Sequence, residues 1–278
     1  FISATSSFIK KYGHNFGGQL SLIITGDEEK EAVNGTKKMM EWTKNNNIVF
    51  NHCIVGEPTS NKIVGDKIKI GRRGSINFFI TVKGVQGHTA NSQRAENPAH
   101  FLITLLNNII SKPLDDGSEF FLPSSIQVPT FDVGNSAANV IPEFARATVN
   151  IRFNDIHSVE SLTKWFQDNI DRVFANFPKA SCTFKTDQVG ESYLTNPDQL
   201  CSLVSTAIRE VSGKNGNPEM ATDGGTSDAR FIKNYCEVLE LGLVNRTLHQ
   251  VNENVDLSDL KELHDIYLRI LENYFKKN

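Results

Sequence analysis

Cysteine, methionine and tryptophan are all scarce in this sequence. Its 278 residues include four cysteines, three methionines and two tryptophans. The cysteines are scattered and form no C-x-x-C pair, so the sequence predicts neither a disulfide framework nor a zinc site built from thiolates. We expect buried, reduced thiols at Cys53, Cys182, Cys201 and Cys236.

A charge imbalance and a long apolar run are also missing. The 29 basic and 32 acidic residues leave a formal net charge of −3, which argues against nucleic acid or an anionic membrane as the main partner, because both favour a basic surface. No apolar run approaches the ~20 residues needed to span a bilayer, and no segment has the layout of a signal peptide. We expect a cytoplasmic protein of one or two domains.

Two more features are absent, one at the start of the chain and one among its histidines. Apolar residues follow a helical period from Phe1, and Gly13 provides a stop, but no capping residue opens this helix. We therefore expect that residues precede Phe1 in the full protein. None of the seven histidines lies in an H-x-D triplet, the spacing that would place two metal ligands on one strand face.

Short apolar runs followed by acidic loops indicate an α/β sheet at both ends of the chain. Residues 21–25 and 52–55 are strand-like and flank a helix over 36–44, and each strand leads into a loop with carboxylates. Such sheets place their sites at the carboxyl ends of strands. After residue 189 the pattern returns, with helices over 197–211 and 260–271 and a strand over 237–241.

The central region has a different pattern. Strand-like and helical segments alternate there in the order β-α-β-β-α-β, which is typical of a ferredoxin-like α+β sandwich. The predicted segments are 75–83, 98–110, 124–131, 145–153, 159–173 and 181–185. We therefore predict a module over 74–188, inserted into a larger α/β domain formed by 1–73 and 189–278.

Three loops contain residues suited to metal-assisted hydrolysis. Glu28 and Glu29 directly follow the first strand and point in different directions, so one can bind a metal while its neighbour acts on a water. Glu57 follows the second strand, and His249 supplies an imidazole, the commonest zinc ligand beside carboxylates. Each residue alone also fits an ordinary surface turn, and together they leave a two-metal site short of ligands.

Other residues are suited to binding an anion. His88 lies in a glycine-flanked turn and can donate to an oxyanion, while Arg72 and Arg152 can grip carboxylates. The turn at 223–230 offers backbone N–H groups and the hydroxyls of Thr226 and Ser227, or is simply a turn into a capped helix.

Seven short motifs occur in an order that resembles the family of zinc aminoacylases and carboxypeptidases. They are T-G-D-E-E at 25–29, G-E-P-T at 56–59, G-R-R-G-S at 71–75, G-H-T-A at 87–90, N-V-I-P at 139–142, G-G-T-S-D-A-R-F at 224–231 and V-N-x-x-x-H at 244–249. The likeness covers essentially the whole chain. Within the family, G-R-R-G-S and G-G-T-S-D favour the members that hydrolyse N-succinylated diamino acids.

The resemblance implies a role for each matched residue. Glu28 matches the general base, and Glu29, Glu57 and His249 match ligands of two zinc ions, for which cobalt can substitute. His88 matches a histidine that crosses a homodimer, formed through the inserted module, to the partner's site. Substrate contacts are implied for Arg72, Asn139, Arg152, Thr226, Ser227 and Asn245. Ala138 departs from the pattern, since the position is often asparagine.

The family's H-x-D histidine and bridging aspartate have no match in this sequence, so we expect the chain alone to have little activity. Two alternatives stay open. The substrate can be another N-acyl amino acid, or the chain can be a non-catalytic dimeric homologue that acts as a binding protein. Glu28 argues against the second, because a scaffold needs no general base.

Overall fold

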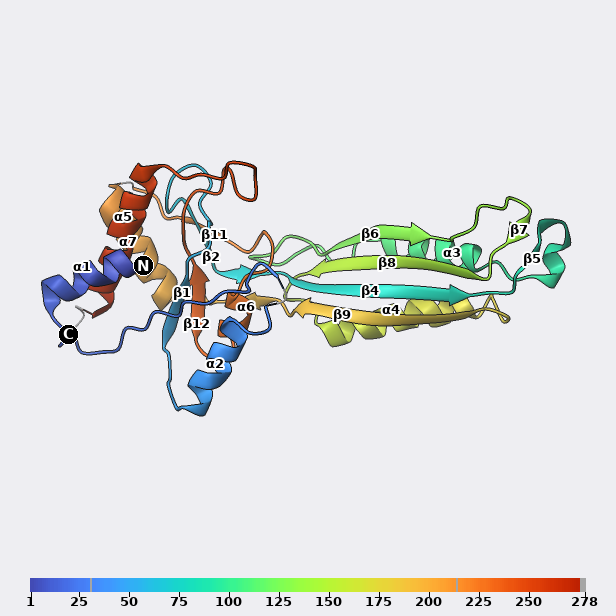
Figure 1. Cartoon of the computed structure of the whole chain (residues 1–278), viewed down its shortest axis with the longest axis horizontal. Helices are drawn as coiled ribbons and strands as arrows, with labels where there is room; N and C mark the ends of the chain where they lie inside the picture. The colour runs from blue at the N-terminus through green and yellow to red at the C-terminus, as the bar shows by residue number, and fades with distance from the viewer. Residues whose placement is uncertain (31, 214, 276–278) are drawn as a thin grey trace. The chain divides into compact units, whose positions relative to one another are not determined.

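The computed structural model describes residues 1–30, 32–213 and 215–275, and it divides into two compact units. Unit 1 comprises residues 1–72 and 193–278, and unit 2 comprises residues 73–192 (Figure 1). The sequence-predicted insert, 74–188, lies inside the bounds of unit 2. No helix in the described part of the chain is long and apolar enough to cross a membrane.

Unit 2 is an antiparallel sheet covered by two helices. Its elements follow the order β4 (Gly74–Lys83), α3 (Pro98–Ile110), β6 (Ser125–Asp132), β8 (Phe144–Phe153), α4 (Val159–Phe174) and β9 (Ser181–Gly190). The sheet order is β6-β8-β4-β9. This is the arrangement of a ferredoxin-like sandwich, as the sequence predicts. A small ribbon of β5 (Gly87–His88) and β7 (Val140–Ile141) and the short helix η1 (Thr89–Arg94) complete the unit.

The core of unit 2 follows from residue alternation. Along β8, alternate residues from Ala145 to Phe153 are buried, and the residues between them are more exposed. Because side chains alternate between the two faces of a strand, one face of the sheet packs on the helices. The rings of Phe78 and Phe166 stack there with centroids 4.0 Å apart, and both side chains are fully buried. This face forms one continuous hydrophobic cluster with α3 and α4.

Unit 1 contains a mixed sheet of four short strands in the order β1-β12-β2-β11. These are β1 (His52–Val55), β12 (Glu237–Glu240), β2 (Lys67–Lys69) and β11 (Glu219–Ala221). β1 runs parallel to β12, and β2 runs antiparallel to β12. A two-stranded ribbon of β3 (Gly71–Arg72) and β10 (Tyr193–Leu194) belongs to the same unit. β1 is an edge strand of this sheet.

Helices lie on both sides of the unit 1 sheet (Figure 1). α1 (Ile2–Tyr12) and α5 (Gln199–Ser212) pack on α7 (Leu257–Phe275), and α2 (Thr36–Asn45) packs on the short α6 (Ala229–Ile232). Aromatic rings join the first group: Phe8 contacts Phe16 and Phe275, and Phe1 stacks on Tyr267 at 4.2 Å. α1 ends at Gly13, whose left-handed φ of 71° closes the helix, and Phe1 makes no side-chain cap.

One predicted element is wrong. Residues 21–25 were expected to form a strand, but the structure places no strand there. The segment is extended, and Leu22 and Ile24 are exposed. A strand requires a hydrogen-bonded neighbour, and none of the described strands pairs with this run. The four cysteines are free; Cys201 is buried and the other three are half-buried.

Candidate functional site

Asp27 organises the loop that presents Glu28 and Glu29. Its carboxylate accepts hydrogen bonds from the backbone of Val33 and Asn34, at 2.9 and 3.3 Å. Its own backbone has a left-handed φ of 70°, which aspartate tolerates better than most residues. The loop leaves Glu28 half-buried and Glu29 exposed. The sequence analysis assigned no role to Asp27. The available signal was an aspartate after a glycine at the start of a turn, where its carboxylate can accept backbone hydrogen bonds.

Glu57 follows β1 and is held by a close backbone approach. The backbone N–H of Leu241 donates to the carbonyl of Val55, at 3.0 Å. A Cβ on Gly242 would overlap the carbonyl oxygen of Glu57, so only glycine fits at this position without a shift of the backbone. The loop after β1 and the loop after β12 are therefore packed directly against each other.

Burial and neighbouring carboxylates perturb the acids of this site. Burial, with the charges of Glu240 and Glu28, raises the pKa of Glu57 to about 7. Burial, then the charges of Glu29 and Asp228, also raises the pKa of Glu28. Like charges that disfavour ionisation in this way gather where a cation or a proton is to be held. The three glutamates of the two loops therefore lie in one electrostatic neighbourhood.

His249 reaches the same neighbourhood from the loop after β12. Its Nε2 lies 3.9 Å from Oε2 of Glu29, and both side chains are largely exposed. The His249 backbone has a left-handed φ of 58°, unusual for a residue with a side chain. The structure thus brings together two predicted ligands that are separated by more than two hundred residues in the sequence.

Arg72 and Ser227 meet at a buried acid that sequence reasoning missed. Glu240 is fully buried at the end of β12, and both nitrogens of one edge of the Arg72 guanidinium donate to it, Nε at 3.0 Å. The hydroxyls of Ser227 and Tyr193 donate to the same carboxylate. Arg72 also donates to the carbonyl of Gly225 at 2.6 Å. A charged residue ending the apolar run of β12 was the available signal.

This network defines what Arg72 and Ser227 do in the fold. Arg72 neutralises Glu240, Ser227 donates a hydrogen bond to it, and together they fix the glycine-rich turn, leaving Thr226 half-exposed beside Ser227. Such a buried pair is rigid, because movement of either partner would leave the other as an uncompensated buried charge. Their predicted contact with a substrate stays a prediction.

Asn245 lines a cavity of about 290 Å³ in unit 1. Gly56 and Pro58, on either side of Glu57, and Leu248, next to His249, line the same cavity. The backbone N–H of Asn245 donates to the carbonyl of Ser60 at 2.9 Å, which anchors this loop to the one after Glu57. The predicted substrate residue Asn245 therefore lies beside the loops that carry two predicted ligands.

Unit 2 brings His88 and Asn139 together. His88 pairs with Val140 in the ribbon of β5 and β7, and the backbone N–H of Thr89 donates to the carbonyl of Asn139 at 3.0 Å. Nδ1 of His88 accepts a hydrogen bond from the backbone of Ala90, at 3.1 Å. A neutral ring bonded in this way carries its proton on Nε2. His88 therefore presents an exposed N–H donor.

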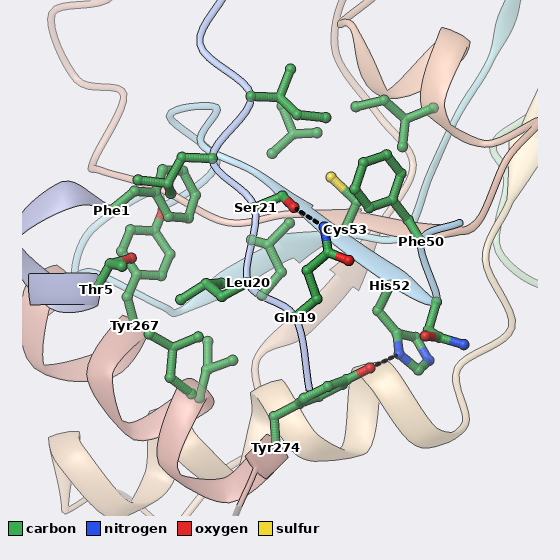
Figure 2. A pocket seen from close by; sticks show the side chains of 18 of the residues that line it. Phe1, Thr5, Gln19, Leu20, Ser21, Phe50, His52, Cys53, Tyr267 and Tyr274 are labelled. Carbon is green, nitrogen blue, oxygen red and sulfur yellow. Dashed lines mark hydrogen bonds between the residues drawn. The ribbon is translucent and has the colours of Figure 1, made fainter. Parts of the chain in front are cut away.

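A larger cavity of about 490 Å³ in unit 1 adjoins the first one and shares Phe1, Gly56 and Tyr267 with it (Figure 2). Phe1, Leu20, Phe50 and Tyr267 line it, and Nδ1 of His52 is hydrogen-bonded to the hydroxyl of Tyr274 at 2.8 Å. The described lining includes none of the predicted catalytic or metal residues. Its walls are the run at 20–25, the edge strand β1 and α7, so it is a gap beside the sheet rather than the predicted site.

The side chains of the loops that carry Glu29, Glu57 and His249 meet some of the requirements of a zinc site. Carboxylate oxygens and an imidazole are ligands that zinc takes, and two ligands of one zinc ion lie about 3–4 Å apart, as Glu29 and His249 do. Among residues 1–30, 32–213 and 215–275, however, no group of three histidine, cysteine or acidic side chains is placed to hold a metal ion. The described residues therefore bring two candidate ligands together without completing a three-ligand group.

Glu57 and His249 lie on loops after β1 and β12, and Glu29 joins His249 from the loop after the unpaired run at 21–25. With a sandwich inserted in the chain, this arrangement is typical of a metal-dependent hydrolase. A family model makes the assignment specific. The model of peptidase family M20/M25/M40 matches residues 3–273, and the chain belongs to this family.

Curated relatives of high similarity share one name. A succinyl-diaminopimelate desuccinylase of Parvibaculum lavamentivorans is 47% identical over 277 residues, which are 98% of this chain and 69% of that protein. A desuccinylase of Ruegeria is 48% identical over 258 residues, covering 93% of this chain and 67% of that protein.

Solved structures of low identity share the fold. An aminopeptidase of Bacillus cereus matches 90% of this chain with a TM-score of 0.71 at 14% identity, and the chain spans 63% of it. A metallo-carboxypeptidase of Sulfolobus solfataricus matches 90% of this chain with a TM-score of 0.66 at 13% identity, and the chain spans 69% of it.

Proposed function

We propose that the chain is the larger part of a succinyl-diaminopimelate desuccinylase. The reaction is hydrolysis of N-succinyl-LL-2,6-diaminopimelate to succinate and LL-2,6-diaminopimelate, a cytoplasmic step of bacterial lysine and diaminopimelate biosynthesis. The convergence of Glu29 and His249, at 3.9 Å, carries the proposal, since it joins two family motifs from opposite ends of the sequence. The 44–48% identity to curated desuccinylases supports the choice of substrate.

Each residue has a defined task in this proposal. Glu29, His249 and Glu57 hold two zinc ions, for which cobalt can substitute, together with ligands from outside the described residues. The bound metal would polarise the amide carbonyl and lower the pKa of a water. Glu28 takes the proton from that water and delivers it to the leaving amine.

His88 and the polar residues act on the substrate. The exposed Nε2–H of His88 donates to the developing oxyanion, from the partner subunit of a homodimer formed through unit 2. Asn139 and Thr226 donate to the polar groups of the substrate, and Asn245 does so from the edge of its cavity. Arg152 binds a substrate carboxylate, and Arg72 and Ser227 position the turn that carries Thr226.

Steady-state kinetics with two substrates tests the proposal. Full-length enzyme is assayed with N-succinyl-LL-2,6-diaminopimelate and with acetylornithine, in zinc or cobalt. We expect preference for the succinyl substrate and loss of kcat by about 100-fold or more in Glu28→Gln. Preference for acetylornithine would identify another deacylase of the family. Absence of turnover, with a dimer retained in sedimentation, would favour the non-catalytic homologue.

Metal analysis of the 278-residue chain is a separate test. Because its described residues offer no three-ligand group, we expect weak metal binding and little activity for this chain alone. Two tightly bound zinc ions per chain, measured by mass spectrometry of the metal content after dialysis, would contradict this expectation.

A further inference from the structure

Arg73 and Arg152 are two partly buried cations of unit 2 with no anion beside them. None of the ion pairs or side-chain hydrogen bonds found in the described parts of the chain includes either residue. Nε of Arg73 is buried and has no hydrogen-bond partner among the residues that the structure describes. A buried donor without a partner costs free energy, so such groups usually await a ligand or a water.

The register of the sheet places the two arginines together. Arg152 on β8 pairs directly with Ser75 on β4, and Arg73 lies two residues before Ser75. Arg73 directly precedes β4, where continuation of the strand would make it a diagonal neighbour of Arg152, and such neighbours are about 7–8 Å apart at Cα, within reach of long side chains. Consistent with this, burial and then the charge of Arg73 lower the pKa of Arg152.

Asp115 and Glu191, two acids of unit 2, are already engaged by other groups. Asp115 accepts hydrogen bonds from Gly117 and Asn154 and is paired with His157 at 3.0 Å. Glu191 accepts from the backbone of Val159. Two guanidinium groups held close together without a counter-charge repel each other, and one carboxylate bridging both relieves the repulsion through charge-assisted hydrogen bonds.

We propose that Arg73 is a further specificity-determining residue, which binds one substrate carboxylate jointly with Arg152. Ser75 is fully buried beside Arg152 on the neighbouring strand, where its hydroxyl accepts a hydrogen bond from Asn150 at 3.4 Å. The inference rests on the proposed function for the identity of the substrate. The ligand chemistry is a carboxylate, which either the succinyl or the diaminopimelyl part can supply.

Titration calorimetry of the intact chain with succinate and, separately, with diaminopimelate identifies the carboxylate. Succinamide, which is neutral, serves as the uncharged probe. We expect one of the two acids to bind about 10-fold to 100-fold more weakly to Arg73→Gln and to Arg152→Gln, and succinamide not to bind. Arg146→Gln is the matched control, because Arg146 lies on the same strand and the same face at its other end.

The outcomes are distinct. Binding in Arg73→Gln within twofold of the parent, or no binding of either acid to the parent, overturns the inference. If Arg73→Gln fails to fold, Arg73→Lys decides: it keeps the charge but loses the planar fork, so unchanged binding there also overturns it. Carboxylate binding that depends on Arg73, in a protein that does not hydrolyse the succinyl substrate, would reject the proposed function and leave this site intact.

Discussion

The two units differ in how completely they cover their own sheets. In unit 2, one face of a four-stranded sheet is closed by two helices around a continuous core of buried aliphatic and aromatic residues. In unit 1, the edge strand β1 borders a cavity of about 490 Å³, and Ile24 and Val49 near it are 73% and 79% exposed. The fold of unit 2 can be predicted from local sequence patterns, because its own helices cover its sheet. The edge of the unit 1 sheet at β1 cannot be predicted in this way, because an edge strand leaves backbone groups that its own sheet does not pair.

The largest expected effect comes from the unit 2 core. Replacing Phe166 by alanine removes a fully buried ring stacked on Phe78, so the free energy of unfolding of unit 2 should fall by about 4 kcal/mol. Urea denaturation followed by circular dichroism measures it. Phe79→Ala is the control. Phe79 lies next to Phe78 on β4 with its ring on the exposed face, so this substitution should cost less than about 1 kcal/mol. Equal losses would contradict the described packing.

A somewhat smaller loss is expected in unit 1. Glu240→Gln leaves the buried guanidinium of Arg72 without its anion, which should destabilise unit 1 by about 3 kcal/mol. Thermal unfolding monitored by hydrogen exchange of β12 reports on this unit alone. Glu237→Gln, at the half-buried start of the same strand, removes only a partly exposed pairing with His52 and should cost less than about 1 kcal/mol. If the stability of unit 1 is unchanged in Glu240→Gln, the network does not hold the turn at Gly225.

Asp115 should make unit 2 sensitive to acid. Burial alone would raise its pKa, but hydrogen bonds from Ser124, Gly117 and Asn154 outweigh burial, and the pKa is lowered. The resulting stabilisation is complete above the unfolded pKa near 4 and is lost as the pH falls through the folded value. Asp115→Asn should cost about 1–2 kcal/mol at pH 7 and flatten this dependence.

Urea denaturation between pH 2 and pH 7 checks the dependence. Asp168→Asn, an exposed substitution on α4, is the control and should keep the acid sensitivity of the parent. The interpretation fails if Asp115→Asn loses stability with falling pH as steeply as the parent does.

The smallest effect is expected in the run beside the cavity. Ile24→Ser should change the free energy of unfolding by no more than about 0.5 kcal/mol, because the side chain is exposed. The same denaturation experiment measures it. A loss above about 1 kcal/mol would mean that this run is packed in solution, and the contrast between the two units would narrow.

The sequence predicted unit 2 well because its signals are local. Alternation along 145–153 and helical periodicity over 159–173 determine which side of each element is buried, and the order of the elements then allows few topologies. The run at 21–25 failed for the opposite reason. Its composition favours a strand, but strand formation depends on a pairing partner that composition cannot supply.

The sequence identifies candidate site residues through motifs, but it does not identify the partners that these residues have in the fold. Glu28, Glu29 and His249 were recognisable as types, and their approach depends on a fold that joins residues 29 and 249. The anion that pairs with Arg72 could not be recognised from the sequence, because Glu240 lies 168 positions away. Nε of the adjacent Arg73, in contrast, has no hydrogen-bond partner in the described part of the chain. Neighbouring residues of one type thus differ only through contacts that are distant in sequence.

The close approach at Gly242 couples the loop after β1 to the loop after β12. Because the backbone of Glu57 leaves no room for a side chain at Gly242, a displacement of either loop must be transmitted to the other. His249 lies further along the loop that starts at Gly242. The positions of the candidate ligands Glu57 and His249 are therefore coupled. A substitution at Gly242, which has no functional side chain, can displace both.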